Sequence, residues 1–351
     1  MDRVATLPAQ DRRALFQEVA ARRGLTALVI EKDFWVCWTL RRVFALPGLG
    51  EHLIFKGGTS LSKVFGLIER FSEDIDLSIR RDYLGAVGDK DPEQEGVSNN
   101  QRARRVEALR ENCRRTVREE MLPALQASFA ARLGAAAGDP GWTLEPDPSE
   151  MGTLLFTYPS PQKLTAGSVY IRPQIKLEMG SGSDPFPVGR HPVRSYAAET
   201  FPEAFGDPEV TVTALEAERT FWEKATLLHA ECHRPLGKPT PARLSRHLYD
   251  LSRHLYDLMR LSLSPIGEKA LLDQTLRERV VLHKSTYFAS NWANYGTARP
   301  GTFRLVPSGE RVSELRQDYT RMRDMIFAHV PTFEEILGTI QTLEGRINEG
   351  P

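Results

Sequence analysis

The segment FKGGTSLSKVFGLIERFSEDIDLSI, residues 55–79, constrains the fold and chemistry of this chain more than any other. Its start predicts a strand that runs into Gly57 and Gly58, where the missing Cβ atoms let the backbone approach a bulky ligand. Thr59 or Ser60 is expected to cap the following helix, because hydroxyl oxygens accept hydrogen bonds from free N–H groups at a helix start. Such a start also favours phosphate, so the pattern predicts a unit that binds a phosphorylated ligand.

Two aspartates follow on the next predicted strand. From Asp74 to Ile79 polar and apolar residues alternate, which is the period of a half-buried strand. Residues two apart on a strand point to the same side, so Asp74 and Asp76 are expected to project together. A lone acid pair of this kind is commonly a solvated surface pair, but paired carboxylates also hold hard divalent cations. In this order, turn, helix and acid pair fit nucleotidyl transfer, which needs a held triphosphate and neutralised charge.

FKGGTSLSK followed by RFSEDIDLSI resembles the signature of the AbiEii/AbiGii-type toxin nucleotidyltransferases, a branch of the DNA polymerase β-like superfamily. The resemblance extends over most of residues 25–330. It implies transfer of NMP from an NTP with Mg²⁺ or Mn²⁺ as the cofactor, held by Asp74 and Asp76. It also implies the toxin of an AbiE-like, type IV toxin–antitoxin or abortive-infection system in phage defence. The partners expected for such a toxin are an AbiEi-type antitoxin and, as acceptor in some members, tRNA.

The superfamily pattern includes a third acid on a later strand, and we assign it to Glu178. In the predicted strand 168–179, Gln174, Lys176 and Glu178 alternate with apolar residues and therefore share one face. An exposed Lys/Glu face on an edge strand is the alternative. Glu178 would complete the metal site with the two aspartates. The residues expected to bind the nucleotide are Lys56, Gly57, Gly58, Thr59, Ser60, Lys63 and Lys176.

A lysine in the predicted helix 214–234 is the next candidate. Lys224 lies among apolar residues, from which it either extends to water or reaches a phosphate as a point charge. The resemblance assigns functional roles to a lysine here and to an aspartate on the next helix. Because SRHLYDL occurs twice in tandem, at 245–251 and 252–258, that aspartate is Asp250 or Asp257. Spacing counted forward from Lys224 slightly favours Asp250, whereas spacing counted back from the C-terminal motifs fits Asp257. One of the metal-site acids, or Asp250 or Asp257, is expected to accept the proton of the attacking hydroxyl.

The predicted elements follow the order α-β-α-β, an insertion, β-β and then helices only. This order predicts an α+β fold with a nucleotidyltransferase-type mixed sheet, flanking helices and a helical C-terminal domain. The expected catalytic domain is 1–210, with N-terminal helices and a helical insertion at 85–135, and the helical domain is 211–351. Residues 137–150 are expected to be a loop, because they are rich in Gly, Pro and acidic residues.

The charge balance excludes an overall basic protein. The chain has 46 basic and 46 acidic residues, so a nucleic-acid site would be a local patch, such as the arginine-rich stretch 101–118. A solvated helix face is the alternative for that stretch. Cys37, Cys113 and Cys232 are too scattered for a disulfide framework, which favours a reducing compartment. Neither a secretory leader nor a membrane-spanning apolar run is apparent, so a cytoplasmic location is expected.

Other classes of function stay open. The chain could nucleotidylate a protein or a small molecule in place of tRNA, or it could bind a nucleotide without turnover and regulate a partner. His229, Cys232 and His233 have a spacing that zinc ligands can adopt, or they form a helix-end cluster without metal. The donor NTP is not determined by these motifs, because base selection depends on the shape of a pocket.

Overall fold

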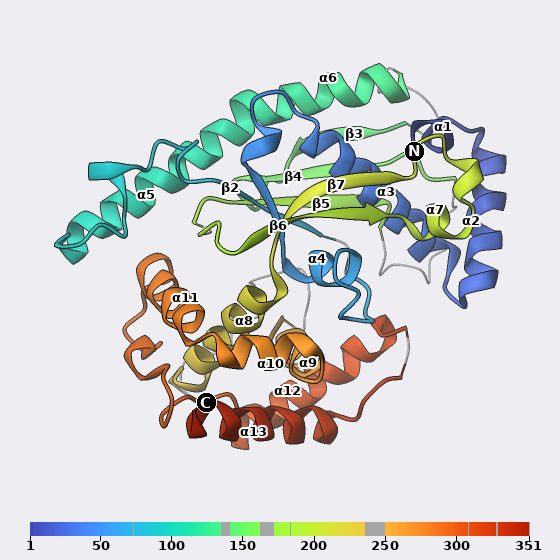
Figure 1. The fold of residues 1–351 in the computed structure, drawn as a ribbon. Helices are drawn as coiled ribbons and strands as arrows, with labels where there is room; N and C mark the ends of the chain where they lie inside the picture. Colours follow the sequence, from blue (N-terminus) through green and yellow to red (C-terminus); the bar gives the residue numbers. More distant parts are fainter. Residues whose placement is uncertain are drawn as a thin grey trace. The chain divides into compact units, whose positions relative to one another are not determined.

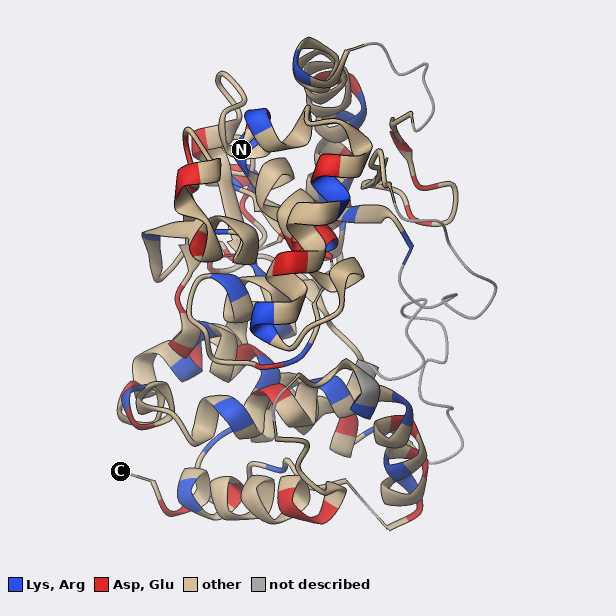
Figure 2. Cartoon of the chain, turned by 90° about the vertical axis from the view of Figure 1, so that its right-hand side faces the viewer, with Lys and Arg blue, Asp and Glu red and all other residues tan. Residues whose placement is uncertain are grey.

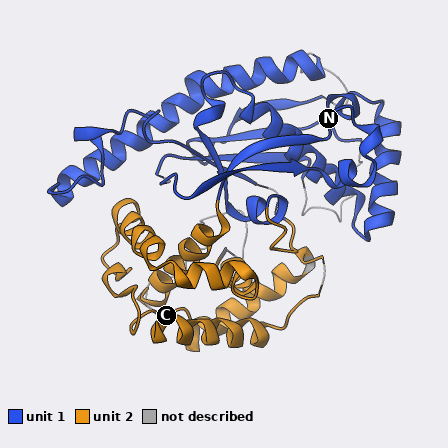
Figure 3. Ribbon diagram, viewed as in Figure 1, with its two compact units in different colours: residues 1–64, 72–215 blue, residues 65–71, 216–351 orange. Residues whose placement is uncertain are grey.

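The structure is a computed structural model that describes all residues except 73, 135–140, 162–171, 183, 236–249, 308, 328 and 351, and except the side chains of Asp250 and Asp324. The chain forms two compact units, shown in Figure 3. Unit 1 comprises residues 1–64 and 72–215, and unit 2 comprises residues 65–71 and 216–351. The expected division at residue 210 thus falls inside the last strand of unit 1, and unit 2 includes a short segment from early in the chain.

Unit 1 is built on a seven-stranded mixed sheet with the order β3-β4-β5-β2-β1-β7-β6 (Figure 1). Its strands are β1 (Leu53–Lys56), β2 (Ile75–Ile79), β3 (Thr143–Pro146), β4 (Thr153–Thr157), β5 (Gln174–Gly180), β6 (Val188–Arg194) and β7 (Glu209–Leu215). In the centre, β2 runs antiparallel to β1 and parallel to β5, while β7 runs parallel to β1. The predicted α+β class with a mixed sheet is therefore confirmed.

Three of these strands, β3, β6 and β7, are not among the strands predicted from the sequence. β3 falls inside the stretch predicted to be a loop, and it lies at the sheet edge with one buried residue of four. β6 forms the other edge and contains Pro192, which is unfavourable in central strands but tolerated at edges. Edge strands face solvent and need no apolar alternation, so they leave a weak signal in the sequence. β7 does carry a readable alternation in EVTVTAL.

The helices of unit 1 are α1 (Asp2–Ala5), α2 (Ala9–Arg23), α3 (Ala27–Phe44), α4 (Gly57–Lys63), α5 (Asn99–Thr116), α6 (Leu122–Leu133) and α7 (Tyr196–Thr200). A π-helical turn at Val117–Met121 joins α5 to α6, so residues 99–133 of the predicted insertion at 85–135 form a nearly continuous helix (Figure 1). The aromatic core lies around Trp38 of α3, which packs on Phe129 of α6 and Phe156 of β4, with ring centroids 4.8 and 5.9 Å away. This core fixes α3 and α6 to the sheet.

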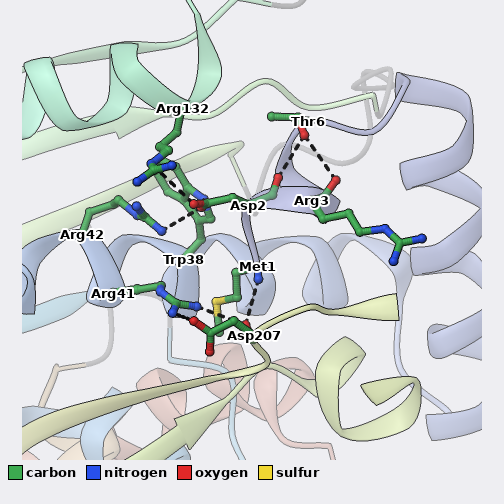
Figure 4. A network of polar contacts seen from close by, with 9 residues as sticks. All are labelled: Met1, Asp2, Arg3, Thr6, Trp38, Arg41, Arg42, Arg132 and Asp207. Atoms are coloured by element: carbon green, nitrogen blue, oxygen red, sulfur yellow. Dashed lines mark hydrogen bonds and ion pairs between the residues drawn. The ribbon is translucent and has the colours of Figure 1, made fainter. Parts of the chain in front are cut away.

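A polar cluster around Asp2 also connects α3 to α6 (Figure 4). The Asp2 carboxylate accepts hydrogen bonds from Trp38 Nε1 at 3.0 Å and from Arg42 Nη2 at 2.7 Å. Arg132 Nε of α6 lies 3.5 Å from the other carboxylate oxygen. Because an ionised acceptor strengthens hydrogen bonds, these contacts hold α1 against both helices.

Unit 2 is helical in its described part. Its helices are α8 (Ala217–Cys232), α9 (Asp250–Ser262), α10 (Pro265–Leu272), α11 (Gln274–Tyr287), α12 (Gly309–Met322) and α13 (Phe333–Glu349). Across the described residues, we find no helix with the length and apolar character needed to cross a membrane.

Residues 65–71, which we call the strap, pair antiparallel with residues 325–327, which follow α12 at the end of a short 3₁₀ turn, Arg323–Met325. The Phe71 N–H donates to the Met325 carbonyl at 2.7 Å, and the Phe327 N–H donates to the Glu69 carbonyl at 2.8 Å. The chain therefore leaves unit 1 after α4, contributes the strap to unit 2, and returns to unit 1 just before β2.

Candidate active site

Gly57 brings the backbone of the glycine turn directly against the second aspartate. Its φ is +78°, a left-handed value that glycine adopts without strain. A Cβ at this position would lie 1.9 Å from Oδ2 and 2.6 Å from Cγ of Asp76, so only glycine fits. The glycine turn and the Asp76 carboxylate are thus in contact.

The helix after the turn begins earlier than the sequence predicts. α4 starts at Gly57, so Thr59 and Ser60 lie within it and do not cap it. The reason is the left-handed Gly57, which turns the chain out of β1 without intervening residues. Thr59 donates its hydroxyl to the Asp74 carbonyl at 2.5 Å and lies 2.9 Å from Ser72 Oγ. It therefore fastens α4 to the chain just before β2.

The register of the central strands places three predicted residues side by side. Asp76 of β2 is paired with Lys56 of β1 and with Glu178 of β5. Directly paired positions on adjacent strands share a face of the sheet, so the three side chains lie on the face of the glycine turn. Lys56 Nζ extends toward β5, where it lies 3.5 Å from the position a Cβ would take at Gly180.

Lys176 neutralises the predicted third acid. Its Nζ lies 2.6 Å from Glu178 Oε1 and 2.7 Å from Glu150 Oε2. Burial favours the neutral amine, but the hydrogen bonds to both carboxylates more than offset it, so the pKa of Lys176 lies above its usual value. Glu178 is therefore in an ion pair in this structure, although its side chain is 37% exposed.

The donor set fits a hard divalent cation without forming a complete cage. Within the described ranges, no three His, Cys, Asp or Glu side chains are grouped closely enough to hold a metal ion. Asp74, Asp76 and Glu178 nevertheless offer only oxygen donors, and Asp76 stands in register with Glu178 beside the turn. Mg²⁺ commonly takes one or two carboxylates and completes its shell with water and substrate phosphates. Such an open donor set matches that preference.

Lys63, predicted to bind the nucleotide, is engaged elsewhere. Its Nζ forms a buried ion pair with Asp33 Oδ1 of α3 at 2.7 Å and lies 3.8 Å from the centre of the Tyr196 ring. The two charged side chains are 6% and 5% exposed. Its acidic and aromatic partners lie within the fold, so we leave Lys63 out of the candidate nucleotide ligands.

Unit 2 contains a second cluster of predicted residues. Asp257 of α9 is fully buried, and Arg70 of the strap reaches its two oxygens at 2.7 and 2.8 Å. Lys224 of α8 lies 2.8 Å from Asp257 Oδ2 and 3.1 Å from His254 Nδ1. The structure thus pairs Lys224 with the aspartate of the second repeat. Asp250 is the first residue of α9, but its side chain, like residues 245–249 of the first repeat, lies outside the described residues.

The charges around Asp257 decide what it can do. Burial would raise the pKa of Asp257, but Arg70 and Lys224 more than offset it and hold that pKa well below its usual value. For Lys224 the balance is reversed, because burial outweighs the attraction of Asp257 and lowers the pKa. A carboxylate with such a low pKa and with both oxygens in ion pairs is a poor proton acceptor. Asp257 suits an anchoring role better than the role of general base.

The remaining candidates from the sequence have ordinary structural surroundings. Burial lowers the pKa of His229 to about 4, and its Nδ1 accepts a hydrogen bond from the Arg304 N–H at 3.0 Å. In the stretch 101–118, Arg104 and Arg115 are exposed, whereas Arg110, Arg114 and Arg118 pair with nearby glutamates. Figure 2 shows basic and acidic residues interspersed over the described chain.

Sequence and structure comparisons relate the chain to known proteins. No curated protein sequence matches the chain. A solved structure of the nucleotidyltransferase toxin MenT4 from Mycobacterium tuberculosis H37Rv is similar, with 15% sequence identity, a TM-score of 0.36, and coverage of 94% of this chain and 98% of that chain. The family model for the nucleotidyl transferase AbiEii toxin of type IV toxin–antitoxin systems matches residues 38–339, a span that includes the glycine turn, the acid pair and Lys224. The chain therefore belongs to the AbiEii family of nucleotidyltransferase toxins.

Proposed function

We propose that this chain transfers a nucleoside monophosphate from an NTP to an acceptor hydroxyl at the site formed by the glycine turn and the acid pair of unit 1. The observation that carries the proposal is the contact of Gly57 with the Asp76 carboxylate. It sets phosphate-binding backbone beside a cation ligand, so that a triphosphate and its counter-ion can be held together.

In this proposal Asp74 and Asp76 hold Mg²⁺ or Mn²⁺, with Glu178 as a third ligand once Lys176 releases it. The bound cation would neutralise charge on the triphosphate and on the leaving pyrophosphate. The backbone of Gly57 and Gly58, with Thr59, Ser60 and Lys56, would orient the phosphates. The acceptor oxygen forms a bond to the α-phosphorus, the bond to pyrophosphate breaks, and a site carboxylate takes the hydroxyl proton.

Lys224 enters the proposal only through the family pattern. In unit 2 it shares Asp257 with Arg70, and its lowered pKa is typical of functional lysines. We assign no proton transfer to Asp257, because both of its oxygens are held in ion pairs.

For the acceptor we propose tRNA, supported by the resemblance to toxins of which some use tRNA and by the exposed Arg104 and Arg115 on α5. A protein side chain or a small molecule is the alternative acceptor. An AbiEi-type antitoxin is the proposed partner, since the family is one of toxin–antitoxin systems.

The test is incubation of the purified chain with each of the four α-labelled NTPs, Mg²⁺ or Mn²⁺, and either total tRNA or a protein extract. We expect label on RNA from one NTP, and its loss by at least about 1000-fold in Asp76→Asn, because charge stabilisation of this kind dominates such reactions. The matched control is Asp82→Asn, since Asp82 is an exposed aspartate paired with Arg80 at 2.7 Å. Label on protein alone would replace the tRNA proposal. If Asp76→Asn remained toxic to cells, a role as a non-catalytic regulator would be favoured.

A further inference from the structure

The helix that carries the glycine turn is held at both ends. At its start, Gly57 touches Asp76, and Thr59 donates to the Asp74 carbonyl at 2.5 Å. At its last residue, Lys63 forms the 2.7 Å ion pair with Asp33. A helix of seven residues is too short to be stable alone, so these contacts decide where α4 lies.

The surroundings of Lys63 explain why its end of α4 is fixed. Asp33 uses one oxygen for Lys63 and accepts the Tyr196 N–H with the other at 2.6 Å. The Tyr196 ring lies 3.8 Å from the ammonium nitrogen, which adds a cation–π contact. Residues of α3 and α7 therefore both contact the Lys63 side chain of α4. The charges of Lys63 and Asp33 compensate each other within the fold.

A displacement of α4 is expected to displace the Asp76 carboxylate as well. The space that a Cβ at Gly57 would need is already filled by the Asp76 carboxylate, so turn and carboxylate are at contact distance. Close-packed groups transmit small displacements instead of absorbing them. A shift at Lys63 is therefore expected to tilt α4 and change the orientation of Asp76.

We propose that Asp33 and Lys63 are positioning residues for nucleotidyl transfer, whose ion pair aligns the glycine turn with Asp76. The inference rests on the proposed function of that site. It differs from the sequence-based prediction, in which Lys63 itself contacts the nucleotide. The two versions make opposite predictions about Asp33, an anionic, buried side chain that pairs with Lys63 and is not expected to bind phosphate.

The experiment is a double-mutant cycle on the full chain with Asp33→Asn, Lys63→Met, the double variant and Lys63→Arg. We expect each single change to lower kcat by about 10- to 100-fold, the loss that a misplacement near 1 Å produces, with KM for the NTP changed less than about threefold. The double variant should be no slower than the slower single variant, because both break one interaction. Lys63→Arg should recover part of kcat.

A matched control is the exposed pair of Glu18 and Arg22 on α2, whose side chains are 54% and 55% exposed at a distance of 2.8 Å. The same cycle there should leave kcat unchanged. If Lys63→Met raised KM while Asp33→Asn stayed normal, Lys63 would be a direct ligand and the positioning role would be overturned. Additive losses in the double variant would overturn it as well.

A second readout does not depend on turnover. We expect Asp33→Asn to weaken Mn²⁺ binding severalfold, measured from the spin-resonance signal of free Mn²⁺, because Asp76 is misaligned. Thermal melting identifies variants that fail to fold, in which case Asp33→Asn and Lys63→Arg still decide the question. If the wild-type chain labels no acceptor with any NTP, the proposed function fails, whereas normal Mn²⁺ binding and normal kcat in a folded Asp33→Asn variant reject only the positioning role.

Discussion

Two buried lysines, Lys63 in unit 1 and Lys224 in unit 2, each lie within 3 Å of a buried aspartate, yet their pKa values move in opposite directions. Burial opposes the charge of Lys63, but Asp33 more than offsets it, so the pKa of Lys63 lies above its usual value. For Lys224, burial prevails and the pKa is lowered. The difference follows from how many cations share the carboxylate.

Asp33 forms an ion pair with Lys63, whereas Asp257 forms ion pairs with both Arg70 and Lys224. A shared carboxylate compensates each cation less, and a second buried cation adds repulsion. Lys63 is therefore held as a permanent ammonium in a balanced pair, which suits a structural tie. Lys224 is left easier to deprotonate beside His254, which suits a residue with a chemical role.

The largest expected effect comes from removing the shared carboxylate. Asp257→Asn leaves two buried cations without their counter-charge, and we expect a loss of about 5 kcal/mol in the free energy of unfolding, the upper end for broken buried ion pairs. Urea denaturation of the full chain, monitored through its helix content, measures this loss. A loss below about 1 kcal/mol would mean that Arg70 and Lys224 find other partners. The proposed difference between the shared and the unshared carboxylate would then be wrong.

Removing the unshared carboxylate should cost less. Asp33→Asn leaves a single lysine uncompensated, and the amide oxygen can still accept the Tyr196 N–H, so we expect a loss of about 3 kcal/mol. The same denaturation experiment on both variants compares the two sites under one protocol. A loss larger than that of Asp257→Asn would reverse the proposed order.

Arg70→Gln should raise the pKa of Lys224, so that its charge state resembles that of Lys63. It removes the competing cation while Asp257 keeps Lys224, so the expected loss is about 2 kcal/mol, typical of hydrogen bonds to charged groups. In the wild type, the pKa of Lys224 is lowered, so the unfolded chain binds more protons between that folded-state pKa and pH 10.5, and this residue makes stability rise with pH within that window. In Arg70→Gln we expect that rise to disappear.

The measurement is the pH dependence of the free energy of unfolding of Arg70→Gln. The difference between this curve and that of Arg70→Gln/Lys224→Met isolates the contribution of Lys224. In contrast, the raised pKa of Lys63 gives stability that is fully present below pH 10.5 and is lost only as the pH rises through its folded-state value. An unchanged slope in Arg70→Gln would show that Arg70 does not set the charge of Lys224.

The smallest effect calibrates the others. Glu18→Gln removes an exposed ion pair on α2, and we expect a change of about 0.5 kcal/mol or less, because solvent screens such pairs. A larger change would mean that surface charges contribute to the differences above, and each would then need correction. Thermal and urea denaturation of this variant provide the baseline.

Local patterns were sufficient for much of the fold and part of the site. The glycine turn and the acid pair lie within 25 consecutive residues, and their order predicts the strand–turn–helix unit and the strand that carries Asp76. The predicted N-terminal helices correspond to α2 and α3 and the predicted helical insertion to α5 and α6, because apolar periodicity reports burial on one face of a helix. The expectation that the strand of Glu178 lies next to the strand of Asp76 is confirmed by their register, whereas the edge strands β3 and β6 left no apolar pattern to read.

From its residues alone, this chain determines an α+β fold, a strand–glycine turn–helix unit and the strand that carries Asp76, because backbone conformation and side-chain period are local properties. Only the tertiary structure decides which charges meet. Arg70 and Asp257 are separated by 187 residues, and Lys63 pairs with Asp33 although its position in the motif suggested a phosphate ligand. The choice of ionic partner depends on how distant elements pack and on how much water they exclude, and a linear spacing does not encode either quantity.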